Sequence, residues 1–348
     1  MHTSFEYTGV IHCHTDYSDG RASVKEVIKE AQKARLDYLI ITDHNTLAPR
    51  RAYPEGFYDG LLVLYGVEVT PRYNHYVALG VDTCPDPTLL PDRYMEETSK
   101  QGGFGFVAHP HDKGSRFLFH PSYEWKSFPV PSMEGMEVWS FMSSWVGYCQ
   151  SFFATLQGLC QPKKYFNGPD PRTLRLWDKE IRKRPVVGIG AVDAHALRTW
   201  VLGRSLTALS HRTAFSTVRS NIVLETPLSD GKEEAIRQVL QALRQGSVYI
   251  CDYSQKFRGG VFFGGSREGR QVKMGEEVDG DKPVDLRAKL PQDGWLRVIK
   301  DGECIYEGKG QTWEKEAASF GVYRLEAGDS KNKRPYVLSN PIYVRGKD

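Results

Sequence analysis

The sequence predicts an α/β fold, a seven-stranded (β/α) barrel followed by a small all-β, sandwich-like domain. Up to about residue 256, short apolar runs alternate with helical patterns, which is typical of a mostly parallel sheet. From residue 257 onward, short strand patterns are separated by turn residues. We therefore expect two domains, residues 1–256 and 257–348, which also suits a chain of 348 residues.

Apolar runs and helical spacing place the elements in order. Strands of the first domain are expected at residues 9–14, 38–45, 61–70, 75–82, 104–110, 136–141 and 185–195. Helices are expected over 23–37, with Ser23 as N-cap, and over 92–102 and 231–246. Strands of the second domain are expected at 259–265, 284–290, 294–308, 321–327 and 335–344, with an Asp-Gly hairpin turn at Lys300–Glu303.

One further helix, over residues 141–160, is unusually apolar. Its apolar side chains recur at helical spacing, which predicts packing in the core, and a lid or subunit interface is the alternative. The stripe comprises Met142, Trp145, Val146, Cys149, Phe152, Phe153 and Leu156.

Composition and charge argue against several classes of protein. The chain has 46 basic and 43 acidic residues, a net charge of +3, and no long basic block, so no nucleic-acid partner is expected. The start "MHTSFEYTG" lacks the apolar core of a secretory signal, and no apolar stretch is long enough to cross a membrane. The six cysteines are scattered without a C-x-x-C motif, which favours a cytoplasmic, reduced protein and excludes a zinc ribbon.

The polar residues at the predicted strand ends are mostly of types that bind metal ions. In a parallel barrel the carboxyl ends of the strands meet at one rim. Any one of these residues alone has an ordinary structural explanation, but so many imidazoles and carboxylates at one rim would repel or stay unpaired without cations. Their mixed nitrogen and oxygen donors suit manganese, zinc or iron. The candidates are His12, His14, Asp19, His44, Glu68, His75, His109, Asp193 and His195.

Five motifs in this order resemble the polymerase and histidinol phosphatase (PHP) superfamily. They are "HCH…DYSDG", "TDHN", "GVE", "AHP" and "DAH", and the resemblance covers roughly residues 9–250. It implies a distorted seven-stranded (β/α) barrel and a phosphoesterase that uses two or three divalent metal ions. The whole chain, with its β domain ending in "GVYRLEA…RPYVLSNPIYV", is also similar to the branch that includes carbaryl hydrolases, which cleave a carbamate ester.

The resemblance further implies how the ligands divide among three metal ions. His12, His14, Glu68 and Asp193 would hold the first ion. Asp19, His44 and His195 would hold the second, with Asp19 where some members of the family have histidine. His75 and His109 would hold the third, with Glu68 bridging it to the first, and Asp43 would orient a ligand histidine.

Clustered metal ions predict hydrolysis, because they activate a water molecule and polarise an ester. We expect a phosphoesterase acting on a small-molecule phosphate ester. The apolar helix over residues 141–160 leaves a homo-oligomer open as a possibility. Lys113, Arg116 and Arg198 are candidates for holding phosphate oxygens, although ordinary loop charges explain them equally well, and His111 is a candidate proton donor.

Three other functions fit parts of the sequence. A carbamate or carboxyl-ester hydrolase would use the same trinuclear metal site. A non-catalytic metal-binding scaffold is disfavoured by the complete ligand set. A nuclease or a proofreading role beside a polymerase is disfavoured by the near-neutral charge.

Overall fold

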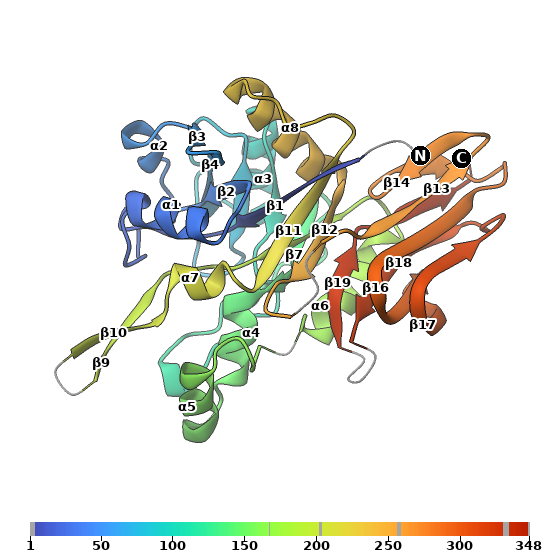
Figure 1. Ribbon diagram of the computed structural model, residues 1–348. Coiled ribbons are helices and arrows are strands. Elements are labelled where there is room, and N and C mark those ends of the chain that lie inside the picture. Colours follow the sequence, from blue (N-terminus) through green and yellow to red (C-terminus); the bar gives the residue numbers. More distant parts are fainter. Residues whose placement is uncertain (1–3, 167, 202–203, 256–258, 330–333, 347–348) are drawn as a thin grey trace.

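The computed structural model describes residues 4–166, 168–201, 204–255, 259–329 and 334–346 and shows a mixed α/β fold (Figure 1). In these ranges one large sheet is accompanied by eight α-helices. The helices gather around the N-terminal strands, and the C-terminal strands lie together at the other side of the molecule (Figure 1). The predicted α/β class is confirmed, whereas the seven-stranded barrel stays a prediction.

Seven strands of the N-terminal part correspond to the seven predicted ones. β2 is parallel to β1 and β4, and β7 is parallel to β6 and β8. β5 is antiparallel to β4 and to β6, which corrects the mostly parallel order. The short connection of residues 70–75 explains the first of these pairs, because a parallel pair needs a long crossover. The strands are β1 (Phe5–Ile11), β2 (Tyr38–Ile41), β4 (Leu61–Val69), β5 (Tyr76–Leu79), β6 (Phe104–Val107), β7 (Gly135–Ser140) and β8 (Val187–Ala191).

Hydrogen bonds join the ends of the first and last of these strands. The amide of Val192 donates to the carbonyl of Ile11 at 3.2 Å, and the amide of His14 donates to the carbonyl of Ala194 at 2.9 Å. The carboxyl ends of β1 and β8 therefore meet where the predicted ligands of both strands lie.

The helices of the N-terminal part begin with sequence signals that could be recognised. α1 (Val24–Lys33) starts at Ser23, whose hydroxyl accepts from the amide of Glu26 while the Glu26 carboxylate accepts from the amide of Ser23. None of the helices in the described ranges is long and apolar enough to span a membrane. The others here are α2 (Pro49–Ala52), α3 (Pro91–Lys100), α6 (Pro171–Ile181), α7 (His211–Ala214) and α8 (Lys232–Gln245).

The apolar segment 141–160 forms two helices, α4 (Phe141–Tyr148) and α5 (Phe152–Cys160), instead of one. Cys149 leaves the helical conformation, and Ser151 caps the new helix by accepting from the amide of Ala154. The first half of the predicted stripe is buried. Its second half is not in the core, because the break turns α5 outward: Phe152, Phe153 and Leu156 are 65%, 75% and 50% exposed.

The C-terminal strands continue the sheet of the N-terminal part. The sequence analysis missed β11 (Val218–Leu224) and β12 (Val248–Asp252). β11 is antiparallel to β1, and β12 is antiparallel to β11 and to β19 (Pro335–Ser339). The predicted hairpin turn at Lys300–Glu303 joins β16 (Asp285–Lys300) to β17 (Glu303–Lys315). The remaining strands are β3 (Gly56–Tyr58), β9 (Leu197–Val201), β10 (Arg204–Leu209), β13 (Phe262–Arg267), β14 (Arg270–Lys273), β15 (Glu277–Asp279), β18 (Gly321–Gly328) and β20 (Ile342–Arg345).

Buried polar contacts tie the C-terminal strands to the strands that carry the predicted ligands. The Asn340 amide accepts from the Gly188 amide and donates to the carbonyls of Gly188 and Val248, each at 2.8 Å. Arg324 on β18 donates to both carboxylate oxygens of Asp178 on α6, at 2.6 and 2.8 Å. The division at residue 257 stays a prediction, and the sheet itself is continuous across it.

Candidate metal centre

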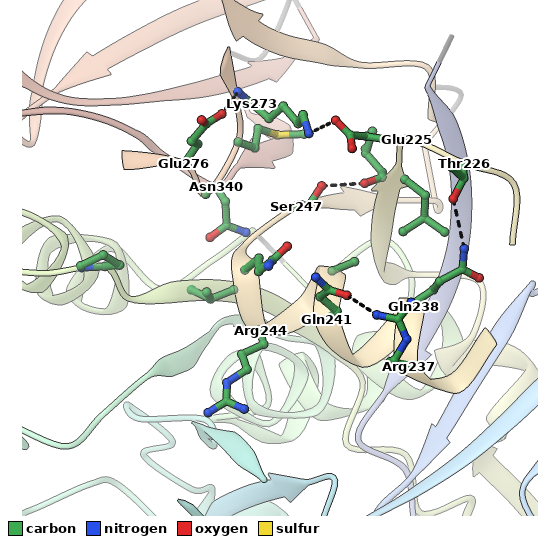
Figure 2. Close-up of a pocket in the computed structure, with 18 of the residues that line it drawn as sticks. Glu225, Thr226, Arg237, Gln238, Gln241, Arg244, Ser247, Lys273, Glu276 and Asn340 are labelled. Atoms are coloured by element: carbon green, nitrogen blue, oxygen red, sulfur yellow. Dashed lines mark hydrogen bonds and ion pairs between the residues drawn. The ribbon is translucent and has the colours of Figure 1, made fainter. Parts of the chain in front are cut away.

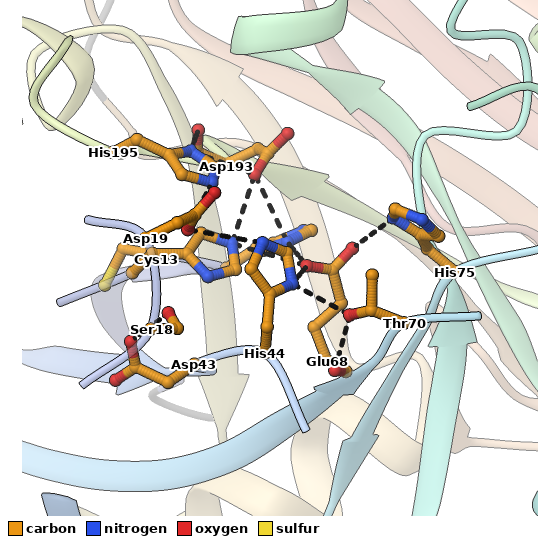
Figure 3. Close-up of polar contacts among 12 residues, drawn as sticks. Cys13, Ser18, Asp19, Asp43, His44, Glu68, Thr70, His75, Asp193 and His195 are labelled. Atoms are coloured by element: carbon orange, nitrogen blue, oxygen red, sulfur yellow. Dashed lines mark hydrogen bonds and ion pairs between the residues drawn. The ribbon is translucent and has the colours of Figure 1, made fainter. Parts of the chain in front are cut away.

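The nine predicted ligands gather at one end of the strands β1, β2, β4, β5, β6 and β8. Figure 3 labels six of them: Asp19, His44, Glu68, His75, Asp193 and His195. β1 ends at Ile11, so His12 and His14 follow the strand instead of alternating within it. His12, His109 and Asp193 have positive φ angles of 68°, 25° and 50° directly after or near a strand end. Such backbone conformations are costly for residues other than glycine and are concentrated at functional sites.

The ligand atoms form three groups, and the candidate atoms within each group lie within 4.8 Å of one another. The arrangement is close to the three predicted subsites, with His14 shared between two of the groups. The groups are His12, His14 and Asp193; His14, Asp19, His44 and His195; and Glu68, His75 and His109.

The Glu68 carboxylate lies at the centre of the cluster (Figure 3). Its Oε1 lies 3.0 Å from Nδ1 of His75 and 3.3 Å from Nε2 of His109. Its Oε2 lies 2.7 Å from Nδ1 of His44 and 3.3 Å from Nε2 of His12. A carboxylate with histidines on both oxygens is placed to bridge two cations.

The Asp19 and Asp193 carboxylates face the remaining histidines. Oδ1 of Asp19 lies 3.3 Å from Nε2 of His44 and 3.2 Å from Nε2 of His195. Oδ1 of Asp193 lies 3.2 Å from Nε2 of His14 and 3.4 Å from Nε2 of His12. Each group therefore contains at least one oxygen donor.

Glu137 on β7, which the sequence analysis missed, holds two of the predicted ligands. Its Oε1 lies 2.5 Å from Nδ1 of His12, and its Oε2 accepts from the backbone amide of His109 at 2.8 Å. The first contact leaves Nε2 of His12 to face Glu68 and Asp193. A carboxylate behind a ligand histidine fixes the ring and its tautomer, which strengthens metal binding. The available signal was a glutamate inside the otherwise apolar run "MEVWSF".

Several buried ring nitrogens have no hydrogen-bond partner within the described ranges. They are Nε2 of His12, both ring nitrogens of His14, Nε2 of His75 and Nδ1 of His109. Buried polar atoms are nearly always satisfied, so unpartnered imidazole nitrogens beside carboxylates need an explanation. Imidazole nitrogens can donate a lone pair to a metal ion, which would give these atoms a partner. The residues present therefore fit a multi-metal site.

Crowding shifts the pKa values of the cluster in opposite directions. Burial lowers the pKa of the His14 imidazole to about 3, and neighbouring His195 adds to this effect. Burial acts against the charge of His44 and His109 too, but Glu68 outweighs it and raises their pKa values to about 10 and about 9. Burial likewise opposes ionisation of Glu68, yet His12 and His44 hold the pKa of its carboxyl well below the usual range. Metal ions would have to displace protons from His44 and His109.

A cavity of about 330 Å³ opens onto the cluster, and seven of the nine candidates line it. Four apolar side chains form part of its wall: Leu118, Phe119, Met142 and Val146. The wall also contains four polar side chains that the sequence analysis did not select: Thr70, Asp112, His120 and Tyr123. No lysine or arginine lines this cavity within the described ranges.

The hydrogen bonds of Asp43 go to the loop that follows His14, and its role in orienting a ligand histidine stays a prediction. Its Oδ1 accepts from the backbone amide of Thr15 at 2.7 Å and from the hydroxyl of Ser18 at 2.5 Å (Figure 3). Its Oδ2 accepts from the hydroxyl of Thr15 at 2.7 Å. Asp43 therefore fixes the loop between His14 and Asp19.

The other predicted catalytic residues do not line the cavity as expected. The ring of His111 faces α6, where Nδ1 lies 2.9 Å from the hydroxyl of Thr173. Lys113 and Arg116 are exposed and are not among the residues of the cavity wall. The loop turns after Pro110 and carries these side chains away from the cluster. The side chain of Arg198 lies outside what the structure describes.

Larger cavities lie elsewhere but lack clustered ligands. One of about 600 Å³ is bounded by α8, β11 and the C-terminal strands (Figure 2). Its charged side chains face one another: Arg237 pairs with Glu234, and Lys273 pairs with Glu225. The metal-ligand groups found in the described ranges all lie at the smaller cavity.

Comparison with known proteins gives a partial family match. The model of the PHP domain matches residues 11–110, which contain seven of the nine candidates but not Asp193 or His195. An uncharacterised protein from Methanocaldococcus jannaschii is 25% identical over 115 residues, which cover 29% of this chain. The match spans 66% of that protein, just under two thirds of its length. The family match and the ligand groups together support a hydrolase with metal-binding side chains.

Two solved structures show a weaker likeness. One is a two-domain protein from Bacteroides vulgatus that contains a predicted PHP-like metal-dependent phosphoesterase. It is 13% identical with a TM-score of 0.46 and covers 97% of this chain and 95% of its own. The other, from Bifidobacterium adolescentis, has the provisional name metal-dependent phosphoesterase. It is 14% identical with a TM-score of 0.34 and covers 56% of this chain and 88% of its own.

Proposed function

We propose that this chain is a metal-dependent hydrolase that cleaves phosphate esters of a small substrate. The observation that carries the proposal is the convergence of nine metal-binding side chains in three adjoining groups beside one cavity. The match of residues 11–110 to the PHP domain supports the same class. Two or three divalent ions of manganese, zinc or iron are proposed as cofactors, because the donors mix imidazole and carboxylate.

Bound divalent ions supply an activated water molecule and a positive charge that stabilises the transition state. The protein's own contribution is to hold the donors at fixed positions. The Glu68 carboxylate contacts histidines of all three groups. Glu137 fixes the ring of His12, and Asp43 fixes the loop that carries Asp19. Because these carboxylates and rings are largely buried, little reorganisation is needed when substrate binds.

The charge of the site favours an anionic substrate. Three divalent ions carry roughly six positive charges, and Glu68, Asp19 and Asp193 offset three of them. The buried Glu137 offsets one more, and the ligand histidines bind metals in the neutral form. The remaining positive charge suits a phosphate group better than a neutral ester.

A carbamate or carboxyl-ester substrate is the second candidate, and the cavity wall favours it. Leu118, Phe119, Met142 and Val146 offer an apolar surface beside the ligand groups. No cationic side chain of the described wall is available to hold phosphate oxygens, so the metal ions would have to hold them. The proposed similarity to carbaryl hydrolases points to the same alternative.

A direct comparison of substrates tests the proposal. The protein loaded with manganese, and separately with zinc, is assayed with p-nitrophenyl phosphate, bis-p-nitrophenyl phosphate and 1-naphthyl methylcarbamate, and metal content is measured on the same batch. His12→Ala serves as the control for contaminating activity. We expect a phosphate ester to give the highest kcat/KM. A tenfold or larger preference for the carbamate, about 1.4 kcal/mol of transition-state binding, would establish the second candidate instead.

We further propose that residues 1–256 form the hydrolase unit and that residues 257–348 act as its structural support. The cavity at the ligand groups is lined by residues no later than His195. The C-terminal strands contact the hydrolase unit through Asn340 and Arg324, which bond to β8, β12 and α6. A homo-oligomer and a cytoplasmic location stay predictions.

A further inference from the structure

We propose that His120 is the catalytic proton donor to the leaving group and that Asp112 positions it. This inference rests on the proposed ester hydrolysis and assigns a residue to one of its steps. His120 and Asp112 both line the cavity that contains seven of the candidate ligands. Neither belongs to the three metal-ligand groups. The pair is therefore available to handle protons at the same cavity.

The two side chains form a partly buried ion-pair contact. Nε2 of His120 lies 3.3 Å from Oδ2 of Asp112, and the side chains are 30% and 2% exposed. Oδ1 of Asp112 is held separately, because it accepts from the backbone amide of Gly114 at 2.8 Å. The carboxylate is thus fixed, whereas the imidazole reaches the solvent-filled space of the cavity.

The backbone of the loop also holds His120 in place. His120 and Ser115 exchange two backbone hydrogen bonds, at 2.9 and 3.0 Å, which close the short loop that contains η1 (Arg116–Leu118). The hydroxyl of Ser122 donates to the carbonyl of Asp112 at 2.8 Å. These contacts give His120 a defined position relative to Asp112.

Tyr123 connects His120 to the ligand cluster. Its ring centroid lies 5.4 Å from that of His120 and 4.8 Å from that of the predicted ligand His75. The ring of Tyr123 therefore contacts both His120 and a predicted ligand. His120, Tyr123 and His75 all line the same cavity, so an ester held at the cluster would share that cavity with His120.

The chemistry needs a proton where the ester bond breaks. In the proposed step, the hydroxide oxygen bonds to phosphorus, and the bond from phosphorus to the leaving oxygen breaks with its electron pair moving to that oxygen. The imidazolium of His120 gives its Nδ1 proton to the same oxygen and becomes neutral, and water then reprotonates it. Asp112 stabilises the charged imidazolium through Nε2.

Substrates that differ only in their leaving group test this assignment. His120→Ala is compared with the parent on phenyl phosphate and on p-nitrophenyl phosphate. Phenolate is a poor leaving group without a proton, so kcat/KM for phenyl phosphate should fall by about 10²- to 10⁴-fold. p-Nitrophenolate leaves readily unprotonated, so the loss on that ester should be about tenfold or less.

Two further variants separate a chemical role from a structural one. Asp112→Asn keeps the acceptor for Gly114 but removes the charge, and it should show the same selective loss in kcat with little change in KM. His111→Ala is the matched control, because it removes an imidazole of the same loop that faces α6 instead of the cavity. Metal content and the thermal unfolding midpoint should stay close to the parent in all three variants.

Equal losses on both phosphates in His120→Ala, or a loss in Asp112→Asn that does not depend on the leaving group, would refute the assignment. Absence of ester hydrolysis by the metal-loaded parent would instead refute the proposed function, and the assignment would fall with it.

Discussion

Replacing Glu137 by glutamine isolates the contribution of a residue that is not itself a predicted ligand. Glu137 is buried and accepts from both the ring of His12 and the backbone amide of His109. Glutamine has the same shape but offers one acceptor where glutamate offers two. The side-chain NH₂ group of the glutamine would therefore face either the ring of His12 or the backbone amide of His109. The change removes a charge and leaves one buried donor without a partner.

The expected magnitude follows from these two contacts. Exchanging a charge-assisted hydrogen bond for a neutral one costs about 1 kcal/mol, and an unsatisfied buried donor costs about 1–3 kcal/mol. We expect the free energy of unfolding of the metal-free Glu137→Gln protein to fall by about 2–4 kcal/mol. Metal affinity should fall by about 10- to 100-fold, as is typical when a residue that orients a ligand is changed.

The assay is competition with a chelator of known affinity, with urea unfolding of the metal-free protein measured in parallel. Glu180→Gln is the matched control. Glu180 on α6 is also a buried glutamate, but it pairs with Lys183 and Arg184, which follow the helix. The Glu180→Gln protein should bind metal as the parent does. If Glu137→Gln bound metal as tightly as the parent while His12→Ala did not, the proposed orienting role would be wrong.

Three other predictions test the site and its support. The reconstituted protein should contain two or three divalent ions per chain. The Asp193→Ala protein should contain at least one ion fewer, and its activity should be lower by orders of magnitude. Elemental analysis that finds less than one ion per chain in the parent would contradict a multi-metal site. Folding raises the pKa of His44 from the ordinary value of 6.5 to about 10 and that of His109 to about 9. The two charged imidazoles therefore stabilise the metal-free protein fully below pH 6.5, and this stabilisation is lost as the pH rises towards these raised values. Urea unfolding at increasing pH should show this decline, and a rise would disprove it. Asn340→Ala should cost about 2–4 kcal/mol of unfolding free energy, because three buried backbone groups lose their partner. Gln241→Ala, which removes an exposed side chain of α8 that accepts from the exposed Arg237, should cost much less.

The metal-binding candidates could be found from sequence because their positions follow strand ends. His44 and His109 come directly after apolar runs, and residues at that position converge whatever the packing details. The directions of the ligand side chains were harder to predict from the sequence. His12 follows β1 with a positive φ instead of continuing the strand predicted over residues 9–14, so the strand pattern did not determine where the rings of His12 and His14 point.

Residues that act through tertiary contacts were not predictable in the same way. Glu137 resembles one charged residue in an ordinary strand, and its partners lie 125 and 28 positions away. The positions of His111 and His120 were not predictable for a related reason. His111 is nearer in sequence to the ligand His109, but the turn of the loop directs it to α6 and brings His120 back to the cavity.

The fold was predicted best where periodicity was strong and least well where packing decides. The amphipathic segments gave α1, α3 and α8 with ends within a few residues of those expected. The orientation of β5 depends on its partners, and the break between α4 and α5 depends on the conformation of Cys149 and the cap at Ser151. Neither feature has a periodic signature.

The hydrogen bonds of Asn340 also bear on the order of events during synthesis. Asn340 lies 152 positions after its partner Gly188, so β8 lacks this support until synthesis has passed residue 340. All nine candidate ligands are translated long before that moment. A nascent chain could thus gather metal-binding side chains before the strand that carries Asp193 and His195 is anchored. A product truncated shortly before Asn340 would retain every candidate ligand but lack the hydrogen bonds that hold β8.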